Sequence, residues 1–405
     1  MNRYDFVKNS GLVIQAKLLK EAEMYPFFRP ISSPQSSTTI IGGKEVLMFG
    51  SNNYLGLNNH PKIKEAAENA IKKYGTSCTG SRFMNGTLDL HLELENELAD
   101  FLGKDGVIIF PTGFQVNTGV IPAMAGKDDL IFVDELNHAS ILDGCQMSIA
   151  QRVKYRHNNM LDLSRRLNRF KDSQGTKLIV TDGIFSMDGD IAKLDQIVEH
   201  ARRYDAFTFV DCAHAIGVIG DHGAGTASHY GITNKVDLIG GTFSKSLASV
   251  GGFVAGNKDI IEFLSHASRT YMFSASLPPA STASALQALR LMRADDSYRL
   301  KLWSNTRYAI RLMREHDLDI GMAETPIIPV YIRDSILTFR IAKKLLDKGI
   351  YVNPVVAPGV KENEALLRFS LTAKHTKEQI EFAIENISKV VKSYEHHIKE
   401  ELVCQ

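Results

Sequence analysis

Short apolar runs alternate with helical patterns through the middle of the chain. In each run the apolar residues are mostly consecutive rather than alternate, which is typical of strands that are covered on both faces. Between the runs, apolar residues recur at helical spacing, as in the stretch that begins at Pro61 and ends at Gly75. The pattern predicts an α/β fold with a mostly parallel sheet under helices, whose strands include 107–110, 130–133, 177–180, 207–210 and 236–239.

The two ends of the chain differ from this pattern. Residues 4–24 predict a charged, mildly amphipathic helix, and a Ser/Thr-rich connector follows it. Beyond about residue 290, a long helical stretch precedes shorter strands, and the last helix begins with a capping box of Thr376 and Gln379. We therefore expect an N-terminal helix and arm at 1–45, a large α/β domain at 46–290 and a smaller α+β domain at 291–405.

Polar and glycine residues follow the predicted strands directly. Ligands of parallel sheets bind beyond the carboxyl ends of the strands, so side chains at these positions are expected to meet in one site. The residues found just after a predicted strand end are Thr112, Gly113, His138, Ser186, Asp211, His214 and Lys245.

The stretch from Val236 to Gly252 carries the most specific chemistry. A short strand is followed by a glycine pair and then by Thr242, Ser244 and Lys245, while the preceding strand ends in Asp211. A lysine for a Schiff base, an acid for a pyridinium nitrogen and hydroxyls for a phosphate suit pyridoxal phosphate. A surface lysine after an ordinary strand is the alternative for Lys245 alone, but its combination with Asp211 and His214 favours the cofactor.

Composition and charge favour an ordinary globular protein over a nucleic-acid-binding or membrane-spanning one. The apolar fraction of 44% and the charged fraction of 23% are those of an ordinary globular protein. A formal net charge of +1 gives no electrostatic reason to expect nucleic acid. No CxxC spacing joins the four cysteines, and neither a membrane-spanning run nor an apolar signal core is found, so we expect no metal site and a cytoplasmic enzyme.

Several motifs resemble those of the α-oxoamine synthases, a family of fold-type I pyridoxal phosphate enzymes. The resemblance covers residues 25 to 376 approximately, and its motifs are GSNNYLGL at 50–57, GSRFMNGTLDLH at 80–91, NHASILDG at 137–144, DGIFSMDGD at 182–190 and GTFSKSLASVGG at 241–252. The segments FRP at 28–30, FSKSL at 243–247 and VNPV at 352–355 favour the serine palmitoyltransferase branch. Cys212 departs from the family, which usually has an acidic residue there.

The resemblance implies catalytic and cofactor roles for residues of the predicted site. Lys245 would bind the cofactor and act as the general base, and Asp211 would keep the pyridine nitrogen protonated. His214 and Ser186 would contact the phenolic oxygen, and His138 would stack on the ring. The catalytic residues are thus expected to be Lys245, His138, Asp211 and His214.

The resemblance also implies phosphate and substrate contacts. Backbone amides at a helix start and nearby hydroxyls would bind the phosphate, and two residues would reach the phosphate of a neighbouring subunit in a homodimer with shared active sites. Arg368 would help His138 to bind the substrate carboxylate, and Asn52 would lie near the acyl donor. The phosphate contacts are Gly113, Phe114, Thr242 and Ser244, with Ser274 and Ala275 for the neighbouring subunit.

The activity implied by this resemblance is a decarboxylative Claisen condensation. L-serine and palmitoyl-CoA would give 3-ketodihydrosphingosine, CoA and CO2, the first step of sphingolipid synthesis. Glycine, alanine or cysteate with another acyl thioester is the alternative within the family, and an aminotransferase is a less favoured use of the same fold. A non-catalytic partner subunit would lack the lysine that is present at 245. Peripheral membrane contact stays open.

Overall fold

The computed structural model describes residues 3–403, and side chains up to residue 394. Contacts divide the chain into two units. The large unit holds Asn52–Ser304 with Thr372–Lys374, and the flanking unit holds Met1–Ser51, Asn305–Leu371 and His375–Gln405. The expected boundaries at 45/46 and 290/291 therefore differ from the contact division, which assigns the N-terminal arm to the same unit as the C-terminal segment. Cys404 lies outside the described residues.

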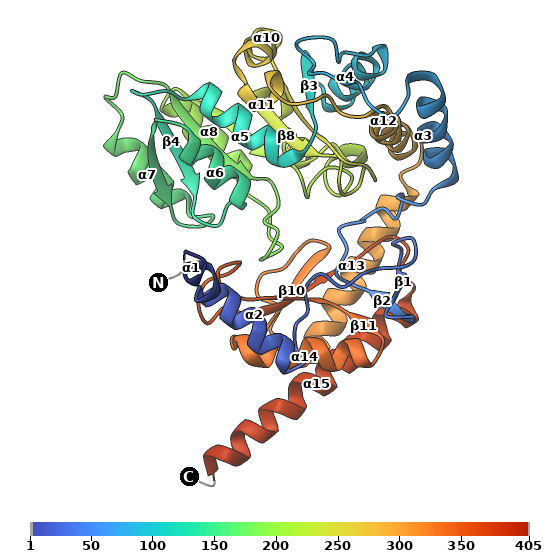
Figure 1. Ribbon diagram of the computed structural model, residues 1–405. Helices are drawn as coiled ribbons and strands as arrows, with labels where there is room; N and C mark the ends of the chain where they lie inside the picture. Colours follow the sequence, from blue (N-terminus) through green and yellow to red (C-terminus); the bar gives the residue numbers. More distant parts are fainter. Residues whose placement is uncertain (1–2, 404–405) are drawn as a thin grey trace. The chain divides into compact units, whose positions relative to one another are not determined.

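A seven-stranded sheet forms the centre of the large unit (Figure 1). Its order is β3-β9-β8-β7-β6-β4-β5, and every pair is parallel except the two that β9 makes with β3 and β8. The mostly parallel fold predicted from the sequence is thus confirmed. The strands are β3 (Gly106–Phe110), β4 (Leu130–Asp134), β5 (Gln151–Tyr155), β6 (Lys177–Asp182), β7 (Ala206–Asp211), β8 (Leu238–Thr242) and β9 (Gly252–Gly256).

Strands β5 and β9 were missing from the sequence prediction, and each departs from the apolar run in a different way. Strand β5 lies at the edge and buries only Val153 and Tyr155, because polar or charged residues occupy its other positions. Strand β9 begins and ends with glycine, although every residue in it is buried. By contrast β4, β6 and β8 are buried along their whole length, as expected of strands covered on both faces.

Helices join and cover these strands. Helix α5 packs on α6 and on strands β8 and β9, and Figure 1 shows α5 and α6 side by side. The core beneath α5 includes Val116, Val120, Phe209 and Leu238. The helices of the large unit are α3 (Pro61–Tyr74), α4 (Asp89–Leu102), α5 (Gly113–Met124), α6 (Ala139–Met147), α7 (Met160–Arg169), α8 (Leu194–Arg203), α9 (Thr226–His229), α10 (Lys258–Ala267), α11 (Arg269–Met272) and α12 (Pro279–Ala294), and two 3-10 turns lie at Asp221–Gly223 and Thr233–Lys235.

The flanking unit contains two small sheets, ordered β1-β2-β11 and β10-β13-β12. Its C-terminal segment is the α+β arrangement expected from the sequence. The elements are α1 (Asp5–Lys8), α2 (Gly11–Glu21), β1 (Thr38–Ile41), β2 (Lys44–Met48), β10 (Ile327–Tyr331), α14 (Ser335–Asp347), β11 (Ile350–Tyr351), β12 (Asn353–Val355), β13 (Leu366–Ser370) and α15 (Lys377–Val403), while α13 (Ser297–Glu315) contains the boundary between the units.

Helix caps decide where these outer helices begin. The single helix expected at 4–24 is wrong, because the chain leaves the helical conformation at Ser10, whose hydroxyl then accepts a hydrogen bond from Val13 N at the start of α2. The expected capping box of α15 is confirmed. Gln379 N donates to Thr376 Oγ1 at 3.2 Å, and Thr376 N donates to Gln379 Oε1 at 3.1 Å.

Two kinds of structure are missing from the described part of the chain. Within residues 3–403, none of the helices has the length and the apolar character needed to cross a bilayer. The same residues contain no group of three or more His, Cys, Asp and Glu side chains that could hold a metal ion.

A buried ion pair fixes the loop that precedes α4. The guanidinium of Arg82 donates to both carboxylate oxygens of Glu95, at 2.7 and 3.0 Å, and Ile109 N donates to the same carboxylate at 3.0 Å. Both charged side chains are under a tenth exposed. The pair therefore connects the loop, α4 and β3.

Glu95→Ala is expected to destabilise the protein strongly, because it leaves the charge of Arg82 buried without its partner. Loss of one member of a buried pair costs about 3–5 kcal/mol. Denaturant unfolding followed by circular dichroism measures this cost. The control is Glu385→Ala, which removes the exposed pair with Lys389 on α15 and is expected to cost under about 0.5 kcal/mol. Equal effects of the two variants would contradict the assignment.

Candidate functional site

A cavity of about 320 Å³ lies at the strand ends of the large unit. It is lined by residues that follow β3, β4, β7 and β8, as the rule for parallel sheets requires. Most of the site residues expected from the sequence therefore meet in one place. The lining residues are Thr112, Gly113, Phe114, His138, Ser140, Asp182, Asp211, Ala213, His214, Thr242, Ser244, Lys245, Val250 and Gly251.

One end of the cavity is suited to a phosphate. Helix α5 begins there at Gly113. The N-cap residue is Thr112, whose hydroxyl accepts a hydrogen bond from Gln115 N at 3.2 Å. A Cβ atom on Gly113 would lie 2.8 Å from the Cβ of Thr242, so only glycine allows the helix start to approach β8 this closely. Free N–H groups and the helix dipole favour an anion at such a helix start.

The hydroxyls beside this helix start are ordered by each other. Thr242 Oγ1 donates to Gly251 O at 2.9 Å and accepts from Ser244 N at 3.2 Å. The hydroxyl of Ser244 lies 2.9 Å from that of Thr242. Because the hydrogen of Thr242 is directed to Gly251 O, Ser244 donates to Thr242 in this hydroxyl pair, which orders both side chains beside the helix start. The donor set and the close approach at Gly113 fit the predicted pyridoxal phosphate.

Asp211 is fixed in orientation at the end of β7. Its Oδ2 accepts from Asn117 Nδ2 at 2.7 Å, and its Oδ1 accepts from Ala213 N at 2.9 Å. Asn117 also donates to Ser140 Oγ at 2.8 Å and so connects α5 to α6. Asn117 was not expected in the site, although an amide inside an otherwise apolar helix face is a detectable signal in the sequence.

His138 lies at the start of α6, where its backbone N donates to Asp182 Oδ2 at 2.7 Å. Its Nδ1 accepts from Ser140 N at 3.2 Å, so a neutral ring carries its hydrogen on Nε2. Burial lowers the pKa of His138, with an opposing contribution from Asp211 and a further lowering by Lys245. The ring is therefore a neutral donor at pH 7.

Asp182 is a second buried acid that the sequence analysis did not assign to the site. It lies opposite Asp211 in the register of β6 and β7. Burial raises the pKa of Asp182 well above its usual value, and the negative charge of Asp211 raises it further. The neutral form of Asp182 is therefore favoured.

His214 is connected to Asn52 through a buried tyrosine. Tyr54 OH lies 2.6 Å from His214 Nδ1 and donates to Asn52 Oδ1 at 3.4 Å. Tyr54 is fully buried and was not assigned a role from the sequence. The contacts bring Asn52 next to a residue of the cavity.

Five of the expected site residues do not line the cavity, and Asn52, described above, is one of them. Ser186 lies in the turn after β6, and Ala275 is exposed. Ser274 accepts from Gln115 Nε2 at 2.9 Å, in the first turn of α5. Arg368 belongs to the flanking unit, where it is buried on β13 and donates to Ser370 Oγ at 2.8 Å. Their roles stay predictions.

The unusual Cys212 does not line the cavity either. Its side chain is fully buried, and Sγ lies 3.8 Å from Thr226 Oγ1. Burial raises the pKa of the Cys212 thiol to about 12. The residue is therefore a neutral packing group, and its departure from the family pattern does not alter the chemistry of the cavity wall.

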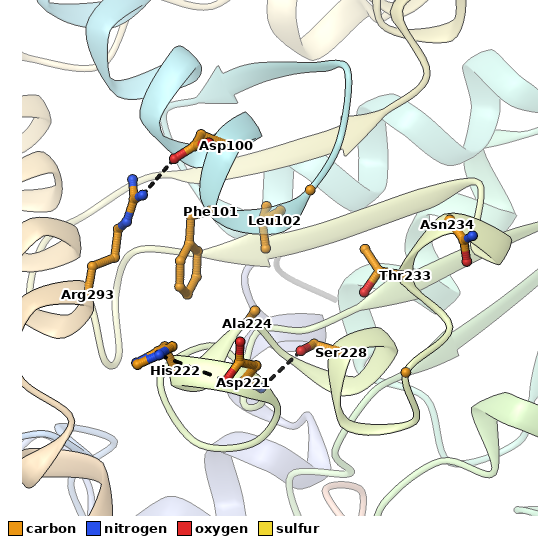
Figure 2. Close-up of a pocket in the computed structure, with 12 residues that line it drawn as sticks. Asp100, Phe101, Leu102, Asp221, His222, Ala224, Ser228, Thr233, Asn234 and Arg293 are labelled. Atoms are coloured by element: carbon orange, nitrogen blue, oxygen red, sulfur yellow. Dashed lines mark hydrogen bonds and ion pairs between the residues drawn. The ribbon is translucent and has the colours of Figure 1, made fainter.

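A larger cavity of about 800 Å³ occurs elsewhere in the large unit (Figure 2). It contains none of the expected site residues. Figure 2 shows the ion pair of Arg293 with Asp100 and the hydrogen bond between Asp221 and Ser228. The ion pair measures 2.6 Å, and Asp221 N donates to Ser228 Oγ at 2.9 Å. Its charged groups are paired with each other, whereas the smaller cavity combines a lysine, buried acids and a helix start. The smaller cavity is the better candidate site.

Comparisons with known proteins agree with this choice. Residues 44–387 match the family model described as aminotransferase class I and II. The chain is 54% identical over 377 residues to a serine palmitoyltransferase of Sphingobacterium spiritivorum, covering 93% of this chain and 94% of the relative. It is 43% identical over 388 residues to an 8-amino-7-oxononanoate synthase of Thermoanaerobacter pseudethanolicus, covering 96% and 97%.

A solved structure is similar over nearly the whole chain. It is a serine palmitoyltransferase variant from S. paucimobilis with a bound PLP–myriocin aldimine, and it matches with a TM-score of 0.93 at 34% identity. The match covers 97% of this chain and 99% of that one. The structural match therefore includes the segments whose residues line the cavity.

Gly113→Ala is expected to weaken the binding of pyridoxal phosphate by about tenfold or more, equivalent to roughly 1.4 kcal/mol. The added methyl would force the start of α5 away from Thr242 and so widen the proposed phosphate site between them. Titration of the apoprotein, followed by the visible absorbance of the bound cofactor, measures the change. In the control Gly126→Ala, the new Cβ has only an ordinary contact at 3.6 Å, and binding is expected to be unchanged.

Proposed function

Because the chain belongs to the aminotransferase class I and II family and, within it, to the α-oxoamine synthases, we propose that it condenses L-serine with a long-chain acyl thioester. The protein is a pyridoxal phosphate-dependent transferase. The strongest support for the reaction is the cavity that Lys245 shares with Asp211 and His138. Palmitoyl-CoA is the proposed acyl donor, and 3-ketodihydrosphingosine, CoA and CO2 are the proposed products.

When bound, pyridoxal phosphate supplies an electron sink next to the amine of the substrate. Lys245 is the residue proposed to hold it and then to take the α-proton of serine on its Nζ. Asp211 is proposed to keep a proton on the ring nitrogen, since Asn117 and Ala213 N hold its carboxylate in one orientation. His138 has its Nε2 hydrogen available for a substrate oxygen.

The mouth of the cavity supports an acyl substrate. Phe114 and Val250 line the cavity and are 48% and 54% exposed. These apolar surfaces are available to the chain of a thioester, and Asn52 is proposed to lie near that donor. The role of Arg368 in binding the serine carboxylate stays a proposal from the family resemblance, as does that of Ser186 at the phenolic oxygen.

A homodimer with shared sites is part of the proposal. Phe273 is 71% exposed and adjoins Ser274, which is bonded to the first turn of α5. A second copy would cover this apolar surface and receive Ser274 and Ala275 at its phosphate. A cytoplasmic location remains a prediction from the sequence.

The identity of the amino acid substrate needs a direct test, because a relative at 43% identity is an 8-amino-7-oxononanoate synthase. Serine, glycine, alanine and cysteate should be titrated separately while the visible spectrum of the holoenzyme is recorded. We expect a saturable shift with serine at the lowest concentration, followed by CO2 release when palmitoyl-CoA is added. Preference for alanine with pimeloyl-CoA would replace the proposed reaction by that of the second relative.

Lys245→Ala is expected to lower turnover by at least about a hundredfold, because general acid–base catalysis contributes roughly 10²–10⁴ in rate. CO2 release with serine and palmitoyl-CoA measures it. Lys258→Ala, at an exposed position at the start of α10, should leave the rate unchanged. A Lys245→Ala protein with normal turnover would refute the proposed base.

A further inference from the structure

His157 bridges two carboxylates outside the cavity. Its Nδ1 lies 3.0 Å from Asp134 Oδ1, and its Nε2 lies 3.0 Å from Asp190 Oδ2. The ring meets the edge of Phe185 with centroids 4.3 Å apart, and the side chain is 19% exposed. Ionised carboxylates only accept hydrogen bonds, so both ring nitrogens must donate and the histidine is a cation.

The first carboxylate fixes the turn that leads to His138. Asp134 is the last residue of β4, and its Oδ1 also accepts from Leu136 N at 2.9 Å. Its Oδ2 accepts from Asn158 N at 2.8 Å. The turn that follows β4 is thereby tied to the residues that follow β5.

The second carboxylate fixes the loop that carries Ser186. Asp190 Oδ2 accepts from Asn158 Nδ2 at 2.6 Å as well as from His157. The backbone oxygen of Asp190 accepts from Phe185 N at 3.0 Å and closes the loop from 185 to 190. One histidine thus holds both loops.

The turn after β4 is also bonded to strand β6 at the cavity wall. Asn137 donates from Nδ2 to Val180 O at 2.9 Å and accepts on Oδ1 from Asp182 N at 2.9 Å. His138 N then donates to Asp182 at 2.7 Å. A shift of the turn after β4 would therefore move His138 against β6.

We propose that His157 is a positioning residue that clamps the loops 134–138 and 183–190 and so holds the ring of His138 in place for the reaction. Its function in catalysis rests on the proposed function above, in which His138 contacts the substrate. Without the clamp, the loops would separate, because the buried carboxylate of Asp134 and the half-buried carboxylate of Asp190 would lose the cation between them.

Electrostatics support a cation at this position. Burial alone would lower the pKa of His157, but the hydrogen bonds with Asp134 and Asp190 raise it to about 10. The other charged groups nearby are Glu135, whose Oε1 accepts from His157 N at 3.5 Å, and Lys193, whose Nζ donates to Asn158 O. The pKa of His157 in the folded protein is above its usual value of about 6.5. The cation therefore makes its full contribution to the free energy of unfolding below about pH 6.5, and this contribution is lost as the pH rises through about 10.

Hydrogen exchange of the holoenzyme tests the clamp without relying on activity. His157→Phe keeps the aromatic contact with Phe185 and removes both donors. We expect exchange in the peptides covering 134–142 and 183–191 to accelerate by roughly tenfold or more, with α10 unchanged. The control is His229→Phe, which replaces an exposed histidine whose ring meets that of Tyr230 edge to face and makes no such bridge.

Two further measurements separate positioning from general stability. The difference in Tm between wild type and His157→Phe should shrink as the pH is raised from 7 to above 10, since the wild type then loses the same cation. In the serine titration, the variant should still bind the cofactor but should need a higher serine concentration for the spectral shift. If His157→Phe does not fold, Asp190→Asn removes one end of the bridge and is expected to give the same local acceleration.

The outcomes distinguish this inference from the proposed reaction. Unchanged exchange around His138 in a folded His157→Phe or Asp190→Asn protein would refute the clamp, even if serine is the substrate. Accelerated exchange in both peptides supports the clamp, including in an enzyme whose wild type prefers another amino acid.

Discussion

The register of three neighbouring parallel strands determines where the chemistry of this protein can occur. Asp182 on β6 lies opposite Asp211 on β7, and Asp211 lies opposite Gly240 on β8. Because the strands run in the same direction, all three end at one edge of the sheet. The residues that follow them, with Lys245 after β8, therefore converge on a small volume. A shift of β7 by one residue would move Asp211 to the other face of the sheet.

Buried acids at this edge are stabilised in three different ways. Asp134 is paired with the cation of His157, and Asp211 is held by the amide of Asn117. Asp182 accepts from the backbone of His138 and has a raised pKa, which favours a proton on it. Three neighbouring strand ends thus carry the same residue type in three different environments. The environment, and not the residue type, makes Asp211 the acid available to a cofactor.

The parts that follow from local sequence could be predicted, and the parts that depend on distant contacts could not. The apolar strand runs, the helix from Pro61 and the cluster around Lys245 were predicted because each has a signal within a few residues. Strand β5 was missed because it is a charged edge strand, and β9 because glycine obscures the pattern.

The supporting residues of the site show the same limit. Asn117, Tyr54, Asp182 and His157 act through partners that lie far away in the sequence, as with the 94 positions between Asn117 and Asp211. A short window can reveal an unusual polar residue, such as Asn117 in an apolar helix face, but it does not reveal the distant partner through which that residue acts. Roles that involve a second subunit, such as that expected for Ala275, cannot be read from the geometry of one chain.

The flanking unit has a topology that affects how the protein is made. Strand β2, near residue 46, pairs in parallel with β11, near residue 350, so that its first sheet is completed only when most of the chain has been synthesised. The large unit is nearly contiguous from Asn52 to Ser304 and can begin to fold on the ribosome before that point. Strands β1 and β2 form a hairpin on their own, but their partner arrives last. Translation therefore imposes an order on assembly, because β2 is synthesised before the large unit but is fully packed only after β11 has emerged.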